Sequence, residues 1–374
     1  MKPHILFCSD FPLGYHNPEA ELKLRLFAER GYGTTYVEKL GIRNPRAGQL
    51  LQRLRAREPA PVARSGSPIA TCSPKLLPPR RAPGIDAFNR GWLERQLLAR
   101  VPDPASTILW LRFPTPELVP LAERPEWPLV VYEVVDDHAR SPGIDGRLRR
   151  VLEAAEARVL ARAGVVFAWS EPIAERLRER HRNVVLAPAA AHLDAFARAR
   201  EAASPRPRVA AYAGALDFRF DAALVADLAG RLADWTLRLA GPADRDVAGA
   251  LGGLANVELI GRLPAGEVPR FLAGASVCVM PYREDAFNDN LFPIKLVECL
   301  ASGRPTVSTG IRAAREFSDV VAVASGAQAF ADAVARAGSE DSLEASARRV
   351  TRAAPYGWER RIDEMEAAIS AALA

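Results

Sequence analysis

The chain of 374 residues contains few cysteines, and no two of them are close in sequence. Cys8, Cys72, Cys278 and Cys299 share no CxxC spacing. This spacing argues against a zinc site, and four distant cysteines in a chain of this length argue against a disulfide framework. We therefore expect reduced and mostly buried thiols.

Long apolar runs are also absent from the sequence. No stretch approaches the roughly 18 uninterrupted apolar residues of a membrane span, and Ser9, Asp10 and Pro12 interrupt the apolar start in a way that does not fit a secretory signal. With 49% hydrophobic and 25% charged residues, the composition excludes a disordered or collagen-like chain. These features predict a globular cytoplasmic protein.

Acidic residues are scarce in one segment of a chain whose net charge is +5. Between Gly41 and Gly84 the only acid is Glu58. The basic residues of this segment are Arg43, Arg46, Arg53, Arg55, Arg57, Arg64, Lys75, Arg80 and Arg81. Such a segment contacts an anionic partner or keeps the protein in solution. The leucines at 50, 51 and 54 favour a core-facing helix over a membrane-surface face, and the second option stays open.

The first half of the sequence alternates between strand and helix patterns. A buried strand at 4–8 precedes a helix at 19–29 and a second strand at 33–38. This βαβ unit indicates a parallel sheet that binds ligands at the carboxyl ends of its strands. The further elements expected here are strands at 107–111, 129–135, 165–169 and 183–187 and helices at 146–163 and 171–180.

The second half restarts the same alternation after a proline- and arginine-rich hinge at 203–208. The expected elements are strands at 209–214, 236–240, 257–260, 276–280 and 305–308 and helices at 221–233, 267–273 and 293–301. We therefore predict an α/β protein with two Rossmann-like domains, 1–200 and 201–356. The amphipathic helix in 357–374 has to pack its apolar face on one of them.

The segment 280–307, MPYREDAFNDNLFPIKLVECLASGRPTV, carries the most chemistry. A strand ends in it, a polar loop follows, and a helix begins near Pro293, a residue favoured in a first helical turn. The free N–H groups of that turn, around Ile294, suit a diphosphate, and Lys295 adds a positive charge beside them. Glu298 lies one turn further on, where a carboxylate can accept both hydroxyls of a ribose.

This segment resembles the GT-B glycosyltransferases of family four, in particular the subgroup typified by teichuronic-acid biosynthesis enzymes. In the family, two acids spaced E-x7-E lie at this helix, the first contacting the donor sugar and the second the ribose. Glu298, in the run ECLASGRPTV, matches the second acid; its alternative role is a surface ion pair. Asn290 stands in place of the first acid, as either a donor contact or a plain cap for the following helix.

Other segments agree with the resemblance in order and spacing, over nearly the whole chain. YAGALDFRFD, residues 212–221, is similar to the family's phosphate-side loop, which implies a close backbone approach at Gly214 and a diphosphate clamp at Arg219. Arg262 is implied near the nucleobase. Gly14 lies near the donor phosphates or is a simple turn glycine.

The junction and the end of the chain also bear on the resemblance. The terminal YGWERRIDEM resembles the helix that crosses back to the first domain of a GT-B enzyme, whose two domains face a cleft. Residues 188–192 replace the Asn-Gly-Val-Asp that relatives carry at the junction. We therefore expect a structural role for His192.

The candidate catalytic residues follow the strand in VVYEVVDDH, residues 130–138. Asp136 or Asp137 would accept the proton of an acceptor hydroxyl, orient that hydroxyl, or stabilise positive charge on the donor sugar. The alternative is that the two aspartates cap the next segment or pair with arginines. His138 is the runner-up, because many retaining relatives have a histidine near this point.

Together, the resemblance implies a hexosyltransferase-type enzyme that moves a sugar from a nucleotide-diphosphate donor to a hydroxyl acceptor. UDP, GDP and dTDP donors all stay open. The expected reaction retains the anomeric configuration and uses no metal or other cofactor, although an aspartate at 136 or 137 would also allow inversion. The Asp-x-Asp triplet at 244–246 matches the metal-holding pattern of another glycosyltransferase fold, but such triplets are common and we expect no metal there.

The pathway and partners expected from the resemblance are broader. Glycan, glycolipid or glycosylated natural-product biosynthesis all fit. The basic segment suits an anionic or lipid-linked acceptor, with peripheral contact at the inner face of the membrane, but a neutral soluble acceptor also stays open, and nucleic acid is not expected. The alternatives are a nucleotide-sugar 2-epimerase of the same fold and a non-catalytic nucleotide-sugar binding protein.

Overall fold

The computed structural model describes residues 2–9, 12–13, 19–38, 69–78, 82, 84–140 and 144–374, with only the backbone for His138. Gly14, the three leucines at 50–54 and all of the basic segment's arginines lie outside the described residues. The chain divides into unit 1, residues 1–187 and 362–374, and unit 2, residues 188–361. None of the described helices is both long and apolar enough to cross a membrane.

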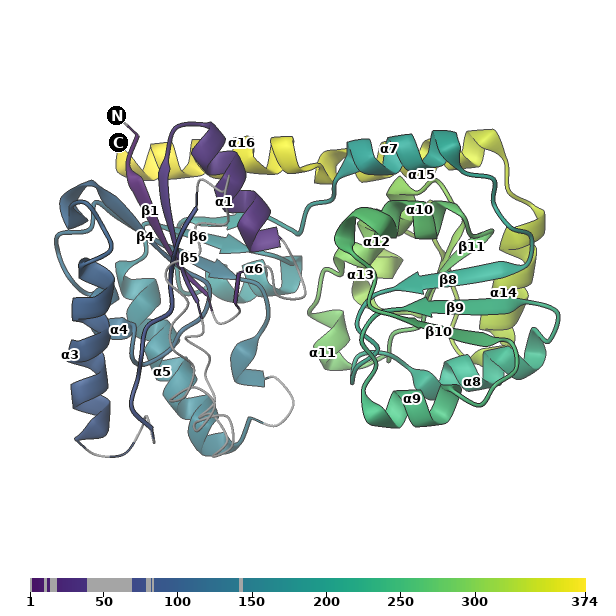
Figure 1. Ribbon diagram of the computed structural model, residues 1–374, viewed down its shortest axis with the longest axis horizontal. Helices are drawn as coiled ribbons and strands as arrows, with labels where there is room; N and C mark the ends of the chain where they lie inside the picture. Colours follow the sequence, from purple (N-terminus) through teal and green to yellow (C-terminus); the bar gives the residue numbers. More distant parts are fainter. Residues whose placement is uncertain are drawn as a thin grey trace. The chain divides into compact units, whose positions relative to one another are not determined.

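Unit 1 is built on a parallel sheet with the strand order β3-β2-β1-β4-β5-β6-β7 (Figure 1). The strands are β1 His4–Cys8, β2 Gly33–Val37, β3 Ala70–Cys72, β4 Thr107–Leu111, β5 Leu129–Val134, β6 Val165–Ala168 and β7 Val184–Leu186. Every residue of β4, β5 and β6 is buried. Near-continuous apolar strands are typical of a parallel sheet that is covered on both faces.

Helices cover both faces of this sheet. Leucine, valine and alanine side chains of four helices pack against one face in a single hydrophobic core. These helices are α3 Ile85–Leu98, α4 Val119–Ala122, α5 Gly146–Arg162 and α6 Glu171–Arg178. On the other face, Phe27 of α1 Glu19–Glu29 packs edge-on against Trp110 of β4. Side chains along a strand alternate between the two faces, so Tyr132 of β5 points to the first face and Glu133 to the second.

The second face buries a charged cluster around Glu133, which is 0% exposed. Lys23 of α1 binds both Glu133 and Glu19, and Arg112 lies 3.1 Å from Glu19. The indole N–H groups of Trp110 and Trp169 donate to Glu133 at 2.9 and 2.8 Å. Burial alone would raise the pKa of Glu133, but Lys23 and Arg112 hold it below its ordinary value. We call these groups the Glu133 cluster.

Unit 2 contains a second parallel sheet, with the strand order β10-β9-β8-β11-β12-β13. The strands are β8 Val209–Ala213, β9 Thr236–Ala240, β10 Val257–Gly261, β11 Val277–Met280, β12 Thr306–Ser308 and β13 Ala322–Val323. The helices are α7 Leu193–Ala202, α8 Ala222–Arg231, α9 Arg245–Leu251, α10 Val268–Ala273, α11 Ala286–Asp289, α12 Ile294–Ala301, α13 Arg312–Arg315, α14 Ala327–Ser339 and α15 Leu343–Ala353. The two sheets confirm the α/β layout of two Rossmann-like domains.

The division between the units falls before α7 rather than after it. We placed the junction at 200, but α7 packs against α10 and α12 and therefore belongs to unit 2. The hinge expected at 203–208 accordingly lies inside unit 2. The last helix, α16 Trp358–Leu373, begins in unit 2, and from Ile362 onward it belongs to unit 1.

All four cysteines are buried free thiols, as expected.

Candidate functional site

In unit 2, the sequence motifs lie at the point where the strand order reverses. The chain order runs from β8 outward to β9 and β10 on one side, and from β11 to β12 and β13 on the other. In open parallel sheets, ligands bind beyond the carboxyl ends of the strands at such a switch point. The loop after β8 carries Gly214 and Arg219, and the loop and helix after β11 carry Asn290, Lys295 and Glu298.

Arg219 is held by its neighbour Asp217. The Asp217 carboxylate accepts hydrogen bonds from the Arg219 guanidinium at 3.0 and 2.6 Å and from the Arg219 backbone N–H at 3.0 Å. The guanidinium also lies over the ring of Phe218, 5.7 Å from its centroid. These contacts fix the orientation of the Arg219 guanidinium. Asp217 is a partner that the sequence patterns did not identify.

Lys295 and Glu298 face one another on the first turns of α12. The Lys295 ammonium donates to Glu298 at 2.9 Å, across an i, i+3 spacing. Burial would lower the pKa of Lys295, but the charge and hydrogen bond of Glu298 raise it above its ordinary value. Lys295 therefore remains a cation at neutral pH.

The buried Tyr282 links these cations. Burial raises the pKa of its hydroxyl, while Arg219, Tyr212 and Lys295 lower it in part. Both cations therefore act on the same phenol, from the β8 side and from the β11 side. The antiparallel bridge between Phe220 and Tyr282 joins the two loops at this point.

Two glycines allow the backbone of the β8 loop to take this path. A Cβ at Gly214 would lie 2.5 Å from the Tyr212 hydroxyl oxygen. Gly241 has a φ of +146°, and a Cβ there would lie 1.7 Å from the Gly214 carbonyl oxygen. Larger residues would displace the loop that carries Arg219.

The remaining predicted donor residues have different surroundings. Asn290 follows α11 as its C-cap and donates to the carbonyl of Ala286 at 2.8 Å; the N-cap position of the following helix is not Asn290 but Pro293. Pro293, in extended conformation, is the cap, and α12 begins one residue later than expected, at Ile294. Arg262 is exposed directly after the edge strand β10.

His192, for which we expected a structural role, belongs to a segment next to α12. It precedes α7, which packs against α12. Burial lowers the pKa of the imidazole, and the carboxylates of Glu298 and Asp194 partly oppose this effect. The imidazole therefore lies within electrostatic reach of Glu298. No sequence spacing links position 192 to position 298, so this neighbour could not be found from the motifs.

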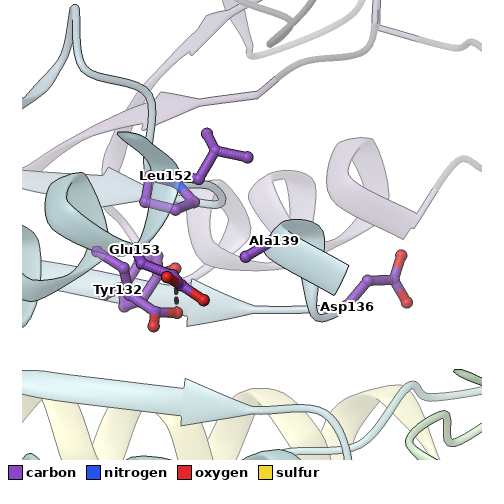
Figure 2. Close-up of a pocket in the computed structure, with 7 residues that line it drawn as sticks. Tyr132, Asp136, Ala139, Leu152 and Glu153 are labelled. Atoms are coloured by element: carbon purple, nitrogen blue, oxygen red, sulfur yellow. Dashed lines mark hydrogen bonds between the residues drawn. The ribbon is translucent and has the colours of Figure 1, made fainter. Parts of the chain in front are cut away.

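In unit 1, Asp136 and Asp137 follow β5 but have different surroundings. Asp137 lies between Arg140 and Arg176, with N···O distances of 3.6 and 3.8 Å. Asp136 has no ion-pair partner among the described residues. It lines a small pocket together with Tyr132, Leu152 and Glu153, and in Figure 2 its side chain points away from Tyr132 and Glu153. The side chain of His138 and all of Gly14 lie outside the described residues.

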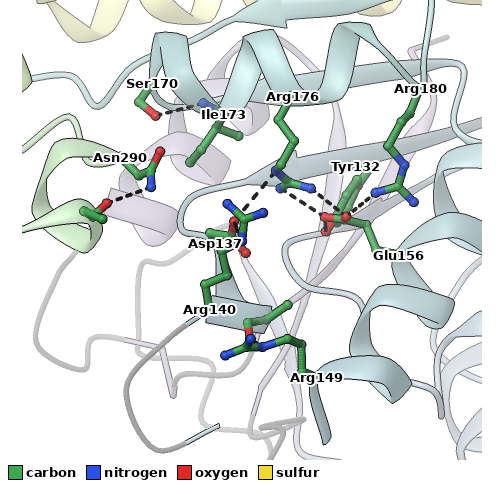
Figure 3. A network of polar contacts seen from close by, with 12 residues as sticks. Tyr132, Asp137, Arg140, Arg149, Glu156, Ser170, Ile173, Arg176, Arg180 and Asn290 are labelled. Atoms are coloured by element: carbon green, nitrogen blue, oxygen red, sulfur yellow. Dashed lines mark hydrogen bonds and ion pairs between the residues drawn. The ribbon is translucent and has the colours of Figure 1, made fainter. Parts of the chain in front are cut away.

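Asp137 belongs to a larger polar network that runs from β5 to α6. Arg176 and Arg180 converge on Glu156, with N···O distances of 2.8 Å to Glu156 Oε2, and Tyr132 donates to Glu156 at 3.2 Å (Figure 3). Burial would raise the pKa of Glu156, but the two arginines lower it below its ordinary value. The pairing with arginines that we set against a catalytic role is therefore present at Asp137.

Residues 208–339 match the protein family described as Glycosyl transferases group 1. One curated relative, TuaH of Bacillus subtilis (strain 168), is named as a teichuronic acid biosynthesis glycosyltransferase and is 27% identical over 247 residues. That alignment covers 60% of this chain and 62% of TuaH, so the chain matches less than two thirds of its relative.

Solved structures share the fold over nearly the full chain. The sucrose-phosphate synthase of Thermosynechococcus elongatus has a TM-score of 0.70 at 15% identity and covers 99% of this chain and 98% of its own. Anabaena Alr3699/HepE, in complex with UDP and glucose, has a TM-score of 0.66 at 13% identity and covers 99% and 100%. The chain has the GT-B fold, and its residues 208–339 match the family of group 1 glycosyl transferases.

Proposed function

We propose that the protein is a glycosyltransferase that moves a sugar from a nucleotide-diphosphate donor to the hydroxyl of an acceptor. The observation that carries this proposal is the set of Arg219, Lys295 and Glu298 at the switch point of unit 2. Two cations and a carboxylate at the carboxyl ends of β8 and β11 suit a diphosphate and a ribose. The UDP and glucose bound to Anabaena HepE support the same class of donor.

In the proposed reaction, the bond between the sugar and the diphosphate breaks and negative charge develops on the departing phosphate. Arg219 and Lys295 offer charge-assisted hydrogen bonds to that charge, together with the N–H groups at the start of α12. Because these groups can supply the charge stabilisation, we propose that the transfer needs no metal. We also propose retention of the anomeric configuration, as the family resemblance implies.

A nucleotide screen tests the donor site. UDP, GDP and dTDP are each added to the protein, and we expect one of them to raise the melting temperature. At a concentration of 100 times Kd the gain is about 2.7 kcal/mol, or roughly 5–10 °C for a unit of this size. Adenosine diphosphate serves as the control nucleotide. The proposal would be abandoned if no nucleoside diphosphate stabilised the protein at millimolar concentration.

The nucleotide that this screen selects also allows the reaction itself to be tested. With a matching nucleotide-sugar and no acceptor, a transferase leaves the donor intact or hydrolyses it slowly. A 2-epimerase of this fold would convert the donor alone, and a binding protein would turn over neither the donor nor an acceptor mixture. Product analysis in the presence and absence of acceptor separates the three.

For the acceptor side, we propose Asp136 as the group that accepts or orients the acceptor hydroxyl. Asp137 is neutralised by Arg140 and Arg176, whereas Asp136 has no such partner among the described residues. We expect Asp136→Asn to lower kcat about 100-fold or more, as loss of a general base does, with little change in the donor KM. We expect Asp137→Asn to change kcat within about fivefold, because Asp137 is already paired with Arg140 and Arg176 and long ion pairs contribute about 1 kcal/mol or less. Steady-state kinetics of the two isosteric variants decide between the aspartates, and the reverse pattern would move the role to Asp137.

A further inference from the structure

Asn288 has a buried polar side chain in the segment between β11 and α12. Neither the sequence motifs nor the proposed function assigns a role to it. It lies in α11, is 1% exposed, and its backbone N–H donates to the Asp285 carboxylate at 2.8 Å. Its side-chain amide donates to two carbonyl oxygens, those of Arg283 at 2.8 Å and Arg219 at 3.3 Å. The amide therefore ties the loop after β11 to the loop after β8.

The Arg219 backbone is fixed on both sides by these contacts. Its carbonyl accepts hydrogen bonds from the Asn288 amide and from the Arg283 N–H at 2.9 Å, and its own N–H donates to Asp217. Asp217 then holds the guanidinium of the same residue. A side chain attached to a backbone held in this way can offer hydrogen bonds without first losing conformational freedom.

The Asn288 amide is held by donation alone. Its Oδ1 atom is buried and accepts no hydrogen bond from any residue that the structure describes. An unpaired buried acceptor is unfavourable, by about 1–3 kcal/mol. A residue selected only for stability would not leave this acceptor unpaired. We therefore attribute the presence of Asn288 to the position of its two N–H donors.

We infer that Asn288 is a positioning residue that presents Arg219 to the diphosphate of the donor. The inference rests on the proposed function, because it requires Arg219 to bind that diphosphate. It assigns to Asn288 a role in donor affinity that acts entirely through Arg219. It also separates Asn288 from Asn290, whose amide makes a local contact with Ala286.

The test compares the affinities of UDP and UMP, or of the corresponding pair for the base that the screen selects. Because Arg219 is assigned to the diphosphate, its loss is expected to weaken the binding of UDP more than the binding of UMP. We expect Asn288→Ala to lower the UDP affinity about tenfold, equivalent to one or two hydrogen bonds, with a smaller change for UMP. Asn288→Ser, whose hydroxyl keeps one donor, is expected to give an intermediate loss and provides a second variant if the alanine variant folds poorly.

Asn256 provides a matched control in the same unit. Its half-buried side chain also donates to backbone carbonyls, those of Ala229, Leu232 and Trp235, at 3.0 to 3.1 Å. Asn256→Ala is expected to lower the melting temperature without changing the ratio of UDP to UMP affinity. A purely structural role for Asn288 would make its variants behave in the same way, and that result would overturn the inference.

A double-mutant cycle with Arg219→Ala completes the test. If Asn288 acts through Arg219, Asn288→Ala weakens UDP binding in the wild-type background and has no further effect in the Arg219→Ala background. An equal loss in both backgrounds would overturn the inference and leave the donor site intact. Unchanged UDP affinity in Arg219→Ala alone would overturn both the inference and the diphosphate role of Arg219, so the two failures are distinguishable.

Discussion

Glu133→Gln is expected to lower the free energy of unfolding by about 3–5 kcal/mol, because it removes one partner from a buried ion pair. The change leaves Lys23 and Arg112 beside Glu19 without the balancing charge of Glu133, in a site where Lys23 is 1% exposed. Urea unfolding followed by tryptophan fluorescence measures the effect. The exposed pair of Glu123 and Arg158, 2.7 Å apart, supplies the control, since Glu123→Gln is expected to change stability by less than about 1 kcal/mol.

The pH dependence of this effect follows from the direction of the Glu133 pKa. In the folded protein this pKa lies below the ordinary value of 4.5. The charged carboxylate therefore contributes stability that is fully present above about pH 4.5 and is lost as the pH falls through the folded pKa. The difference between the wild type and Glu133→Gln should persist at neutral pH and shrink in acid. A difference that grows in acid would contradict the charge balance described for the Glu133 cluster.

A second substitution tests whether the charges of the Glu133 cluster interact with one another, apart from the packing of their side chains. Lys23→Met in the Glu133→Gln background removes the excess positive charge, so the double variant is expected to be more stable than the sum of the single effects indicates. Strict additivity would mean that the two groups do not interact. The cluster contacts Phe7 of β1 and Trp110 of β4 and includes Glu133 of β5, so the same experiment reports on the stability of unit 1.

The second large effect is expected at α12. Lys295→Ala should lower the affinity for UDP by about 10- to 100-fold, the range for a lost hydrogen bond between charged groups. It should weaken inorganic pyrophosphate in the same way, since Lys295 is assigned to the phosphates. Glu298→Gln should weaken UDP about tenfold but leave pyrophosphate unchanged, because the carboxylate is assigned to the ribose. Isothermal titration with both ligands measures each affinity.

The two ligands make the assignment of roles testable. If Glu298→Gln also weakened pyrophosphate, its role would be to hold Lys295, with which it pairs at 2.9 Å. If neither variant changed UDP binding, the donor site would lie elsewhere. The pair of Arg238 and Glu258 on β9 and β10, 2.8 Å apart, gives a control variant, Glu258→Gln, for which no change in either ligand is expected.

The sequence predicted the central strands well, because their composition leaves few alternatives. β4 and β9 have the predicted bounds, and α1 begins and ends where its apolar spacing and glycine terminator indicated. The helix α3, which contains Gly91 and exposes Phe88 and Trp92, was not predicted. A glycine and exposed aromatic residues weaken the apolar periodicity on which helix prediction depends.

The candidate site likewise contains residues that the sequence predicted and residues that it did not. Lys295 and Glu298 were chosen from local patterns and Arg219 from the family resemblance, and their roles as ligands stay predictions. Asp217, Asn288 and His192 were not chosen for the site. The contacts of Asn288 and His192 join segments far apart in sequence, and the motif at 212–221 does not itself indicate that Asp217 pairs with Arg219. The amide of Asn288 reaches a carbonyl 69 positions away. The pairing of β8 with β11 and the bridge between Phe220 and Tyr282 bring those loops together.

Helix α16 also sets the order in which the chain can complete its units during synthesis. Unit 2 is one continuous segment, 188–361, whereas unit 1 includes residues 362–374. Ile362, Met365 and Ile369 of α16 are buried, and Glu366 pairs with Lys2 and Arg30 near the start of the chain. Domains usually fold in the order of their synthesis, but here unit 1, although its first residues are made before unit 2, is complete only once residues 362–374 have left the ribosome.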